Sequence, residues 1–176
     1  MKRGKKLCLV CHCILNGNSK VGGSCKYEGA NVEVVKSLMD RSYGIIQLPC
    51  PENTIYGIRR WGHVKEQFDN NFYRKVSRDL LNPIIDEIQD YINNGYTLEH
   101  IVGVFGSPSC GVYHTCSSAL WHGELSKNEN LSHTLKTVNC VDGAGVFIEE
   151  LINIIEERNI DTKFVEVRES NILPQW

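Results

Sequence analysis

The sequence lacks the features that mark several large classes of protein. It has no run of the roughly 20 apolar residues that a membrane-spanning helix requires. It has no excess of positive charge, since 19 Lys and Arg against 21 Asp and Glu leave a formal charge of -2, which argues against a nucleic-acid partner. Internal repeats, low-complexity tracts and linkers are also absent. With 176 residues, 41% of them hydrophobic, we expect one globular domain over residues 1–176.

Cysteine is more frequent than in an ordinary domain but too sparse for a disulfide scaffold. Eight cysteines in 176 residues lie below the density of about 8–10% at which disulfides hold a small fold together. The basic start and the apolar run after it imitate a secretion signal, but the run contains His12 and three thiols and lacks a small-residue cleavage site. We therefore expect a cytoplasmic protein, in which reduced, clustered cysteines bind metal or take part in chemistry.

Four short runs rich in β-forming residues alternate with helical patterns. The runs cover residues 7–15, 44–48, 101–105 and 164–167. The first and third are almost continuously apolar, which is typical of strands buried on both faces of a parallel sheet. Strands that alternate with helices imply right-handed crossovers. The sequence therefore predicts an α/β fold: a doubly wound, mostly parallel sheet of about four to five strands with helices on both faces.

Three segments carry apolar residues at helical spacing. One follows Asn31, a second recurs at every fourth residue over 64–92, and a third covers 142–159. Pro83 should kink or split the second helix. The expected apolar stripes are Val32, Val35, Leu38 and Met39 in the first helix; Val64, Phe68, Phe72, Val76, Leu80, Ile84, Ile88 and Ile92 in the second; and Val146, Phe147, Leu151, Ile152 and Ile155 in the third.

Three cysteines follow the predicted strands. Cys13 ends the first run, Cys50 follows the second and Cys110 follows the third. Because ligands of open α/β sheets bind beyond the carboxyl ends of the strands, these thiols should meet at one edge. Three thiolates leave one iron of a four-iron cluster open, whereas a closed structural zinc site uses four ligands. The alternative is that they are small buried side chains, as many free cysteines are.

The remaining chemistry-bearing residues give weaker signals. In a strand, Cys11 and Cys13 would share one face and His12 the other. Residues 107–138, poor in regular pattern, suggest a functional loop or lid. Five cysteines favour packing roles: Cys8, Cys11, Cys25, Cys116 and Cys140. Six side chains suit either a heterocycle-binding crevice or a plain surface loop: Arg59, Arg60, Trp61, His63, Tyr113 and His114. The glycine-rich segment 142–145 suits a helix-capping turn better than an anion site.

Four motifs resemble those of the thiouracil desulfidase family. They are Cys-Ile-Leu-Asn-Gly at 13–17, Cys-Lys-Tyr-Glu-Gly at 25–29, Cys-Pro-Glu at 50–52 and Ser-Pro-Ser-Cys-Gly at 107–111. The last two match the family's motifs outright, and the resemblance spans about residues 7 to 115. It implies an oxygen-sensitive 4Fe-4S cluster in which one iron is not bound by protein and takes the sulfur of a thiolated pyrimidine.

Carried over position by position, the cluster ligands are Cys13, Cys50 and Cys110. The family's carboxylate and serine map to Glu52 and Ser107. Glu52 is then the expected general base for water that attacks the thiocarbonyl carbon, and Ser107 is expected to hydrogen-bond the heterocycle or the proton in transit. The expected partner is a small thio compound, and the products are a carbonyl compound and sulfide.

Two alternatives stay open. The three cysteines and a nearby histidine, such as His12, His63 or His114, would form a closed, non-catalytic zinc or iron site. A tRNA 4-thiouridine desulfidase would act on the same thiocarbonyl group, although the chain has neither a basic excess nor an appended RNA-binding domain. The sequence does not decide whether the protein forms a homodimer.

Overall fold

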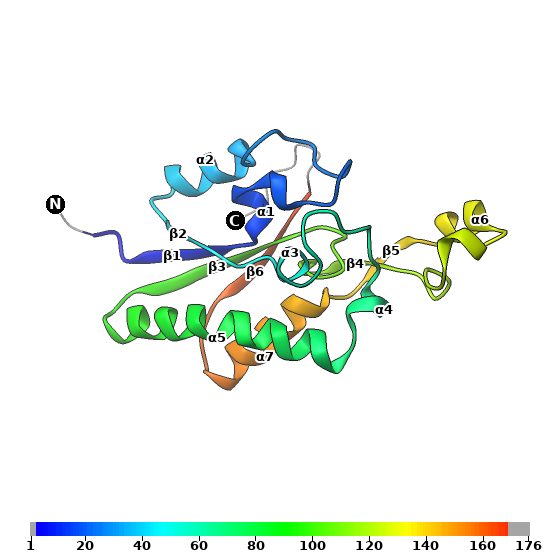
Figure 1. Ribbon diagram of the computed structural model, residues 1–176. Helices are drawn as coiled ribbons and strands as arrows, with labels where there is room; N and C mark the ends of the chain where they lie inside the picture. Colours follow the sequence, from blue (N-terminus) through cyan, green and yellow to red (C-terminus); the bar gives the residue numbers. More distant parts are fainter. Residues whose placement is uncertain (1–2, 169–176) are drawn as a thin grey trace.

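A sheet of four parallel strands forms the centre of the structure, a computed structural model that describes residues 3–168 (Figure 1). The strand order is β2-β1-β3-β6, so the chain steps outward from β1 to β2 and then crosses back to β3. The order therefore reverses between β1 and β3, the place where doubly wound sheets bind ligands. The strands are β1 (Lys6–Val10), β2 (Gly44–Gln47), β3 (Thr97–Val104) and β6 (Lys163–Val167).

Helices cover both faces of this sheet, as predicted. Figure 1 shows α1 and α2 on one face and α5 and α7 on the other. The central strands pair through apolar residues at their middle: Leu9 of β1 is opposite Ile46 of β2 and Ile101 of β3. The helices are α1 (His12–Leu15), α2 (Val32–Asp40), α3 (Pro51–Tyr56), α4 (Lys65–Phe68), α5 (Asn71–Asn93), α6 (Leu131–Lys136) and α7 (Val146–Glu157).

The first strand is shorter than predicted. It ends at Val10, and the chain turns at Cys11 into the single helical turn α1. The expectation that a strand places Cys11 and Cys13 on one face is therefore wrong. A short apolar run fits a buried strand and a buried helical turn equally well, and here Cys11 and Ile14, three residues apart, are the buried positions.

Helix α2 confirms the predicted cap but presents a different apolar face. The side chain of Asn31 accepts a hydrogen bond from the amide of Val34 at 3.2 Å, which satisfies a free donor of the first turn. The helix buries Val34 and Leu38, whereas Met39 is exposed. Val32, predicted for the same stripe, is exposed as well.

The predicted long helix is divided at a different place. Residues 65–68 form α4, and α5 then continues without a break through Pro83, so the predicted split there is wrong. Pro83 and Asp79 both lie on the exposed side, where the carbonyl that loses its amide partner is open to water. Val64, Phe68 and Ile88 are buried as predicted, but over residues 73–85 the buried stripe lies one residue later than predicted, and Phe72 is 66% exposed. The buried residues of α5 are Tyr73, Ser77, Leu81, Ile85 and Ile88.

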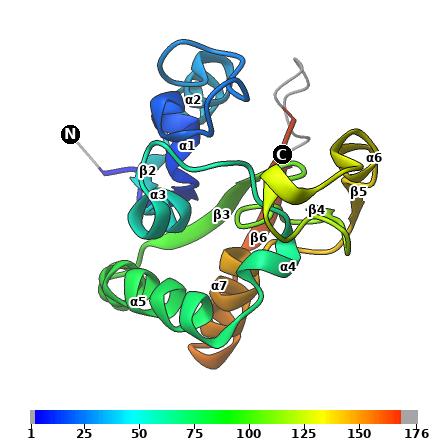
Figure 2. The same ribbon diagram turned by 45° about the vertical axis from the view of Figure 1, so that its right-hand side comes forward.

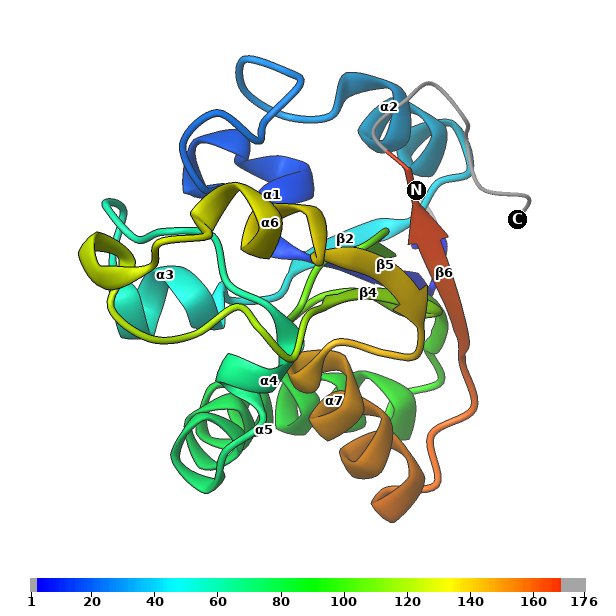
Figure 3. The same cartoon turned by 90° about the vertical axis from the view of Figure 1, so that its right-hand side faces the viewer.

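A two-stranded antiparallel hairpin stands beside the main sheet, and the sequence did not predict it. It consists of β4 (His114–Ser117) and β5 (Asn139–Asp142). Figure 3 looks onto the end of the molecule from which this hairpin and α6 project. Each strand has four residues and little hydrophobic alternation. For this reason β4 was not recognised within residues 107–138, where an irregular loop was predicted. Within residues 3–168, no helix has the length and apolar content to cross a membrane.

Candidate functional site

A cavity of about 520 Å³ opens at the carboxyl ends of β1, β2 and β3. All five residues predicted for the site line it, although they come from three separate segments of the chain. Its position matches the reversal of strand order between β1 and β3. The predicted residues in its wall are Cys13, Cys50, Glu52, Ser107 and Cys110.

Cys13 reaches the cavity from the helical turn after β1. The hydroxyl of Tyr27 donates to the Cys13 carbonyl at 2.8 Å and ties this turn to the loop before α2. Burial, together with the nearby thiols of Cys110 and Cys50, raises the pKa of the Cys13 thiol to about 12. The metal-free site therefore holds Cys13 as a neutral thiol, and a metal must displace its proton.

Cys50 caps the short helix after β2. Its sulfur accepts a hydrogen bond from the amide of Asn53 at 3.4 Å, and Pro51 occupies the first helical position, where its missing N–H costs nothing. Burial raises the pKa of Cys50 to about 11, with a further contribution from Cys110. The Cys-Pro-Glu motif thus starts a helix and directs both the sulfur and Glu52 into the cavity.

Cys110 lies on a loop that folds back onto β3. The amide of Val104 donates to the Cys110 carbonyl at 2.8 Å, and the amide of Cys110 donates to the Ser107 hydroxyl at 2.9 Å. A hydrogen bond with the thiol of Cys11, together with burial, raises the pKa of Cys110 well above its ordinary value. Cys11, predicted as packing, is therefore a direct neighbour of a predicted ligand.

The start of α7 holds the same loop in place. The amide of Val146 donates to the Pro108 carbonyl at 3.0 Å, and that of Ile148 donates to the Ser109 carbonyl at 3.1 Å. A side chain at Gly145 would stand 2.5 Å from the Ser109 backbone, so only glycine permits this approach. The helix begins at Val146 rather than near residue 142, and these two amides of its first turn serve backbone carbonyls instead of an anion.

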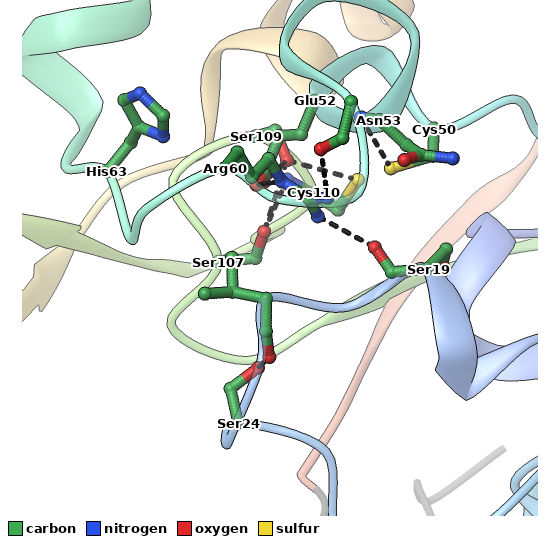
Figure 4. Close-up of polar contacts among 12 residues, drawn as sticks. Ser19, Ser24, Cys50, Glu52, Asn53, Arg60, His63, Ser107, Ser109 and Cys110 are labelled. Atoms are coloured by element: carbon green, nitrogen blue, oxygen red, sulfur yellow. Dashed lines mark hydrogen bonds and ion pairs between the residues drawn. The ribbon is translucent and has the colours of Figure 1, made fainter.

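Glu52 is held by two side chains that differ in kind (Figure 4). The Arg60 guanidinium donates from Nε to Oε2 at 3.1 Å, and the Ser109 hydroxyl donates to Oε1 at 2.6 Å. Only 3% of the Arg60 side chain is exposed, and its other nitrogens donate to the carbonyls of Ser19 and Gly57. The result is a buried ion pair whose carboxylate faces the cavity.

The second serine of the Ser-Pro-Ser-Cys motif, and not the first, touches the carboxylate. Ser109 is fully buried, and its hydroxyl lies 3.3 Å from that of Ser107. Ser107, the predicted residue, lines the cavity and contacts Glu52 only through Ser109. Sequence reasoning missed Ser109 because both serines stand in the same motif and nothing in their order tells which one points at residue 52.

The other candidates separate into cavity residues and outer residues. Arg60, His12 and His63 line the cavity. Trp61 is 76% exposed and does not. Arg59, Tyr113 and His114 also lie outside the lining: Arg59 is exposed, the Tyr113 hydroxyl donates to the Phe164 carbonyl, and the His114 ring binds Glu166 at 2.7 Å.

Both cavity histidines are poor candidates for charged groups at neutral pH. Burial lowers the pKa of His12 and of His63. The His63 ring packs against both Tyr56 and Phe68, with centroids 4.6 and 4.9 Å away, and those two rings also contact each other. In Figure 4 it stands apart from the hydrogen-bonded group around Glu52. His63 therefore forms part of the wall rather than part of that group.

The donor set matches the predicted cofactor in chemistry. Three cysteines on separate segments surround one cavity, and Cys110 raises the pKa of both Cys13 and Cys50, so the three thiolates repel one another until iron neutralises them. Over residues 3–168, no three His, Cys, Asp or Glu side chains gather closely enough to hold a single metal ion. The residues present fit a multi-iron group held at three points of a cavity wall.

One comparison with known proteins bears on the family. The chain is 35% identical to the uncharacterized protein MJ0003 of Methanocaldococcus jannaschii over 164 residues, which make up 93% of this chain and 86% of that protein. The chain belongs to the family of MJ0003. No family model and no solved structure matches it. The name of MJ0003 states no activity, so we infer the function of this chain from its cavity.

Proposed function

We propose that this chain is an iron-sulfur-dependent desulfidase that converts the thiocarbonyl of a small compound, such as a thiolated pyrimidine, into a carbonyl. One observation carries the proposal: three thiols and a buried, arginine-paired carboxylate converge on one cavity at the point where strand order reverses. The overall reaction consumes one water and releases sulfide, so no oxidant or reductant is needed.

The three cysteines would hold the cofactor. Cys13, Cys50 and Cys110 would ligate three irons of a 4Fe-4S cluster. When bound, the cluster supplies a thiophilic iron without a protein ligand, which polarises the C=S bond. The free state of all eight cysteines agrees with a reducing compartment, and we place the protein in the cytoplasm.

Glu52 would act as the general base. Arg60 holds the carboxylate at Oε2, and the carboxylate would accept a proton from the attacking water. The Ser109 hydroxyl fixes the carboxylate plane through Oε1, and Ser107 continues the hydrogen-bonded path along the cavity wall. The carboxylate is thus oriented before substrate enters, as efficient proton transfer requires.

The cavity accommodates a small molecule more readily than a folded RNA. Its volume of about 520 Å³ lies in the usual range for small-molecule sites. It is lined by apolar groups, such as Val104 and Phe105, as well as by polar ones. The net charge of -2 also favours a free base or small metabolite over tRNA as the substrate.

Anaerobic reconstitution tests this function. We expect about four irons and a matching amount of sulfide per chain, brown iron-sulfur absorbance, and sulfide release from a thiouracil. One zinc per chain, or a loaded cluster with no sulfide release from any thiopyrimidine, would contradict the proposal.

A cysteine pair provides the matched control. Cys110→Ala should abolish the iron-sulfur absorbance, because it removes one of only three ligands. Cys140→Ala should retain it, because Cys140 is exposed on the hairpin and lies outside the cavity lining. Equal loss in both variants would show that the absorbance does not depend on the cavity cysteines.

A further inference from the structure

The β4–β5 hairpin carries a second pair of thiols, separate from the three proposed ligands. Cys116 of β4 and Cys140 of β5 are direct partners in the antiparallel register. Residues opposite each other on such a pair point to the same face of the hairpin. Two cysteines 24 positions apart in sequence are thus placed side by side by strand pairing alone.

The hydrogen-bond pattern of the hairpin shows which kind of pair this is. The amide of Gly143 donates to the carbonyl of Tyr113 at 2.9 Å, directly beyond the register pair His114 and Asp142. Because bonded and non-bonded pairs alternate along an antiparallel ladder, Cys116 and Cys140 form a non-hydrogen-bonded pair. The Cα atoms of such pairs lie about 4.5 Å apart, and disulfides span Cα separations of about 4.4–6.8 Å.

The two thiols differ in access to solvent. Cys140 is exposed, as is every residue of β5, so a small reagent can reach its sulfur. Cys116 is half-buried, and its thiol donates to the His63 carbonyl at 3.4 Å. Burial raises the pKa of Cys116 to about 11, with nearby Glu52 adding to the shift. Cys140 is therefore the thiol that reacts first with an oxidising reagent, and Cys116 is the thiol that then attacks the Cys140 sulfur.

We propose that Cys116 and Cys140 form a reversible disulfide by exchange with a small-molecule disulfide such as oxidised glutathione. The Cys140 thiolate attacks one sulfur of the reagent and expels one thiol, leaving a mixed disulfide on Cys140. The Cys116 thiolate then attacks the Cys140 sulfur and expels the second thiol. The protein pair loses two protons and two electrons, and the reagent gains both as two free thiols.

Formation of the disulfide would alter the contacts between the hairpin and the cavity wall. Cys116 gives up its hydrogen bond to the carbonyl of His63, which lines the cavity. The same wall segment is held at Gly62 by the indole of Trp121, at 3.1 Å, and at Glu66 by Ser117. The disulfide therefore changes one of several contacts that fix residues 62–66, without touching any proposed cluster ligand.

Mapping of the oxidised protein tests the pair. The protein is equilibrated with oxidised and reduced glutathione, free thiols are blocked in acid, and the digest is examined by mass spectrometry. Cleavage after Tyr113 separates Cys110 from Cys116. We expect a loss of two of the eight thiols and one link, between Cys116 and Cys140. A link from Cys140 to another cysteine, or glutathione on Cys140 with no internal link, would overturn the proposal.

Two single variants complete the test. Cys140→Ser removes an exposed thiol, so folding is preserved, and the loss of two thiols should disappear while Cys116 stays reduced. Cys25 lies on a different loop, so Cys25→Ser should leave the link between Cys116 and Cys140 unchanged. Persistent oxidation of Cys116 in Cys140→Ser would show that its partner is another residue. These readouts hold whether or not the chain binds a cluster.

Discussion

Two buried glutamates of this molecule are both paired with arginine but stand in different surroundings. Glu52 is 8% exposed and Glu150 is 5% exposed. Glu150 lies between α7 and α5, where Arg74 binds one carboxylate oxygen at 2.8 Å and Arg78 binds the other at 3.3 Å. Glu52 has one guanidinium and one hydroxyl, and it faces a cavity. Burial and pairing with arginine are therefore common to both carboxylates, and the side that Glu52 presents to the cavity is what distinguishes it from Glu150.

The network around Glu150 is structural in character. Arg74 also binds Asp69 and Glu149, and Arg78 binds Glu157. The glutamates at 149, 150 and 157 belong to α7, so these ion pairs join α7 to α5, and the two helices lie side by side in Figure 2. Each arginine is about one-third exposed, and water screens these pairs in part. The pair of Arg60 with Glu52 has no comparable redundancy, and it is almost fully shielded from water.

The largest expected effect separates the two glutamates by activity. Glu52→Gln should lower sulfide release by about 10²–10⁴-fold, because the base is lost while the shape is kept. Glu150→Gln should leave turnover unchanged, because Glu150 lies outside the cavity. Both rates are measured anaerobically with a thiopyrimidine, and the iron-sulfur absorbance of each variant is recorded first. Full turnover in Glu52→Gln would remove Glu52 from the mechanism.

The next effect separates the two arginine systems by stability. Arg60→Ala should lower the free energy of unfolding by about 3–5 kcal/mol, because it leaves a buried carboxylate without its counter-charge. Arg74→Ala should cost only about 1 kcal/mol, because Arg78 still binds Glu150 and the site is partly exposed. Urea unfolding of both variants measures the difference. Equal costs would show that redundancy and exposure do not distinguish the two networks.

A smaller effect distinguishes the two serines. Ser109→Ala should cost about 1.5–3 kcal/mol, because it removes a hydrogen bond to a charged group in a buried place. Ser107→Ala removes a hydroxyl whose partners, the amide of Cys110 and the hydroxyl of Ser109, are both uncharged, so it should cost less than Ser109→Ala. Stability and sulfide release are compared for both variants. A greater loss of turnover in Ser107→Ala than in Ser109→Ala would return the serine role to Ser107.

The sequence predicted much of the site because strand ends can be located from hydrophobic runs. Cys50 and Cys110 follow β2 and β3, whose carboxyl ends lie within one residue of the predicted ends. Because the strands are parallel, both cysteines lie at the same end of the sheet. Cys13 reaches the cavity for a different reason than expected, since a helical turn replaces the end of the strand. Cys13 still lines the cavity, as predicted, because the helical turn lies at the carboxyl end of β1.

Other features depend on tertiary contacts that local patterns do not contain. Glu52 has two side-chain partners: Arg60, which is eight residues later in the sequence, and Ser109, which is 57 residues later. Neither spacing belongs to a helix or a strand. The hairpin of β4 and β5 is equally hidden, because its strands have four residues each and β5 is exposed at every position. Short polar strands carry little of the alternation from which strands are recognised.

An effect that is absent at neutral pH is a dependence of stability on alkaline pH at the cavity end. The folded, cluster-free protein keeps Cys13 and Cys50 protonated up to pH values of about 12 and 11, whereas unfolded thiols ionise near 9. The folded state then binds more protons above pH 9, so the contribution of these two thiols to stability is constant below that pH and is lost as the pH rises toward 12. Cys50→Ser should reduce the slope, measured by urea unfolding at each pH, and the exposed-site variant Cys140→Ser should not. An unchanged slope in Cys50→Ser would show that this thiol ionises in the folded protein as it does in the unfolded chain.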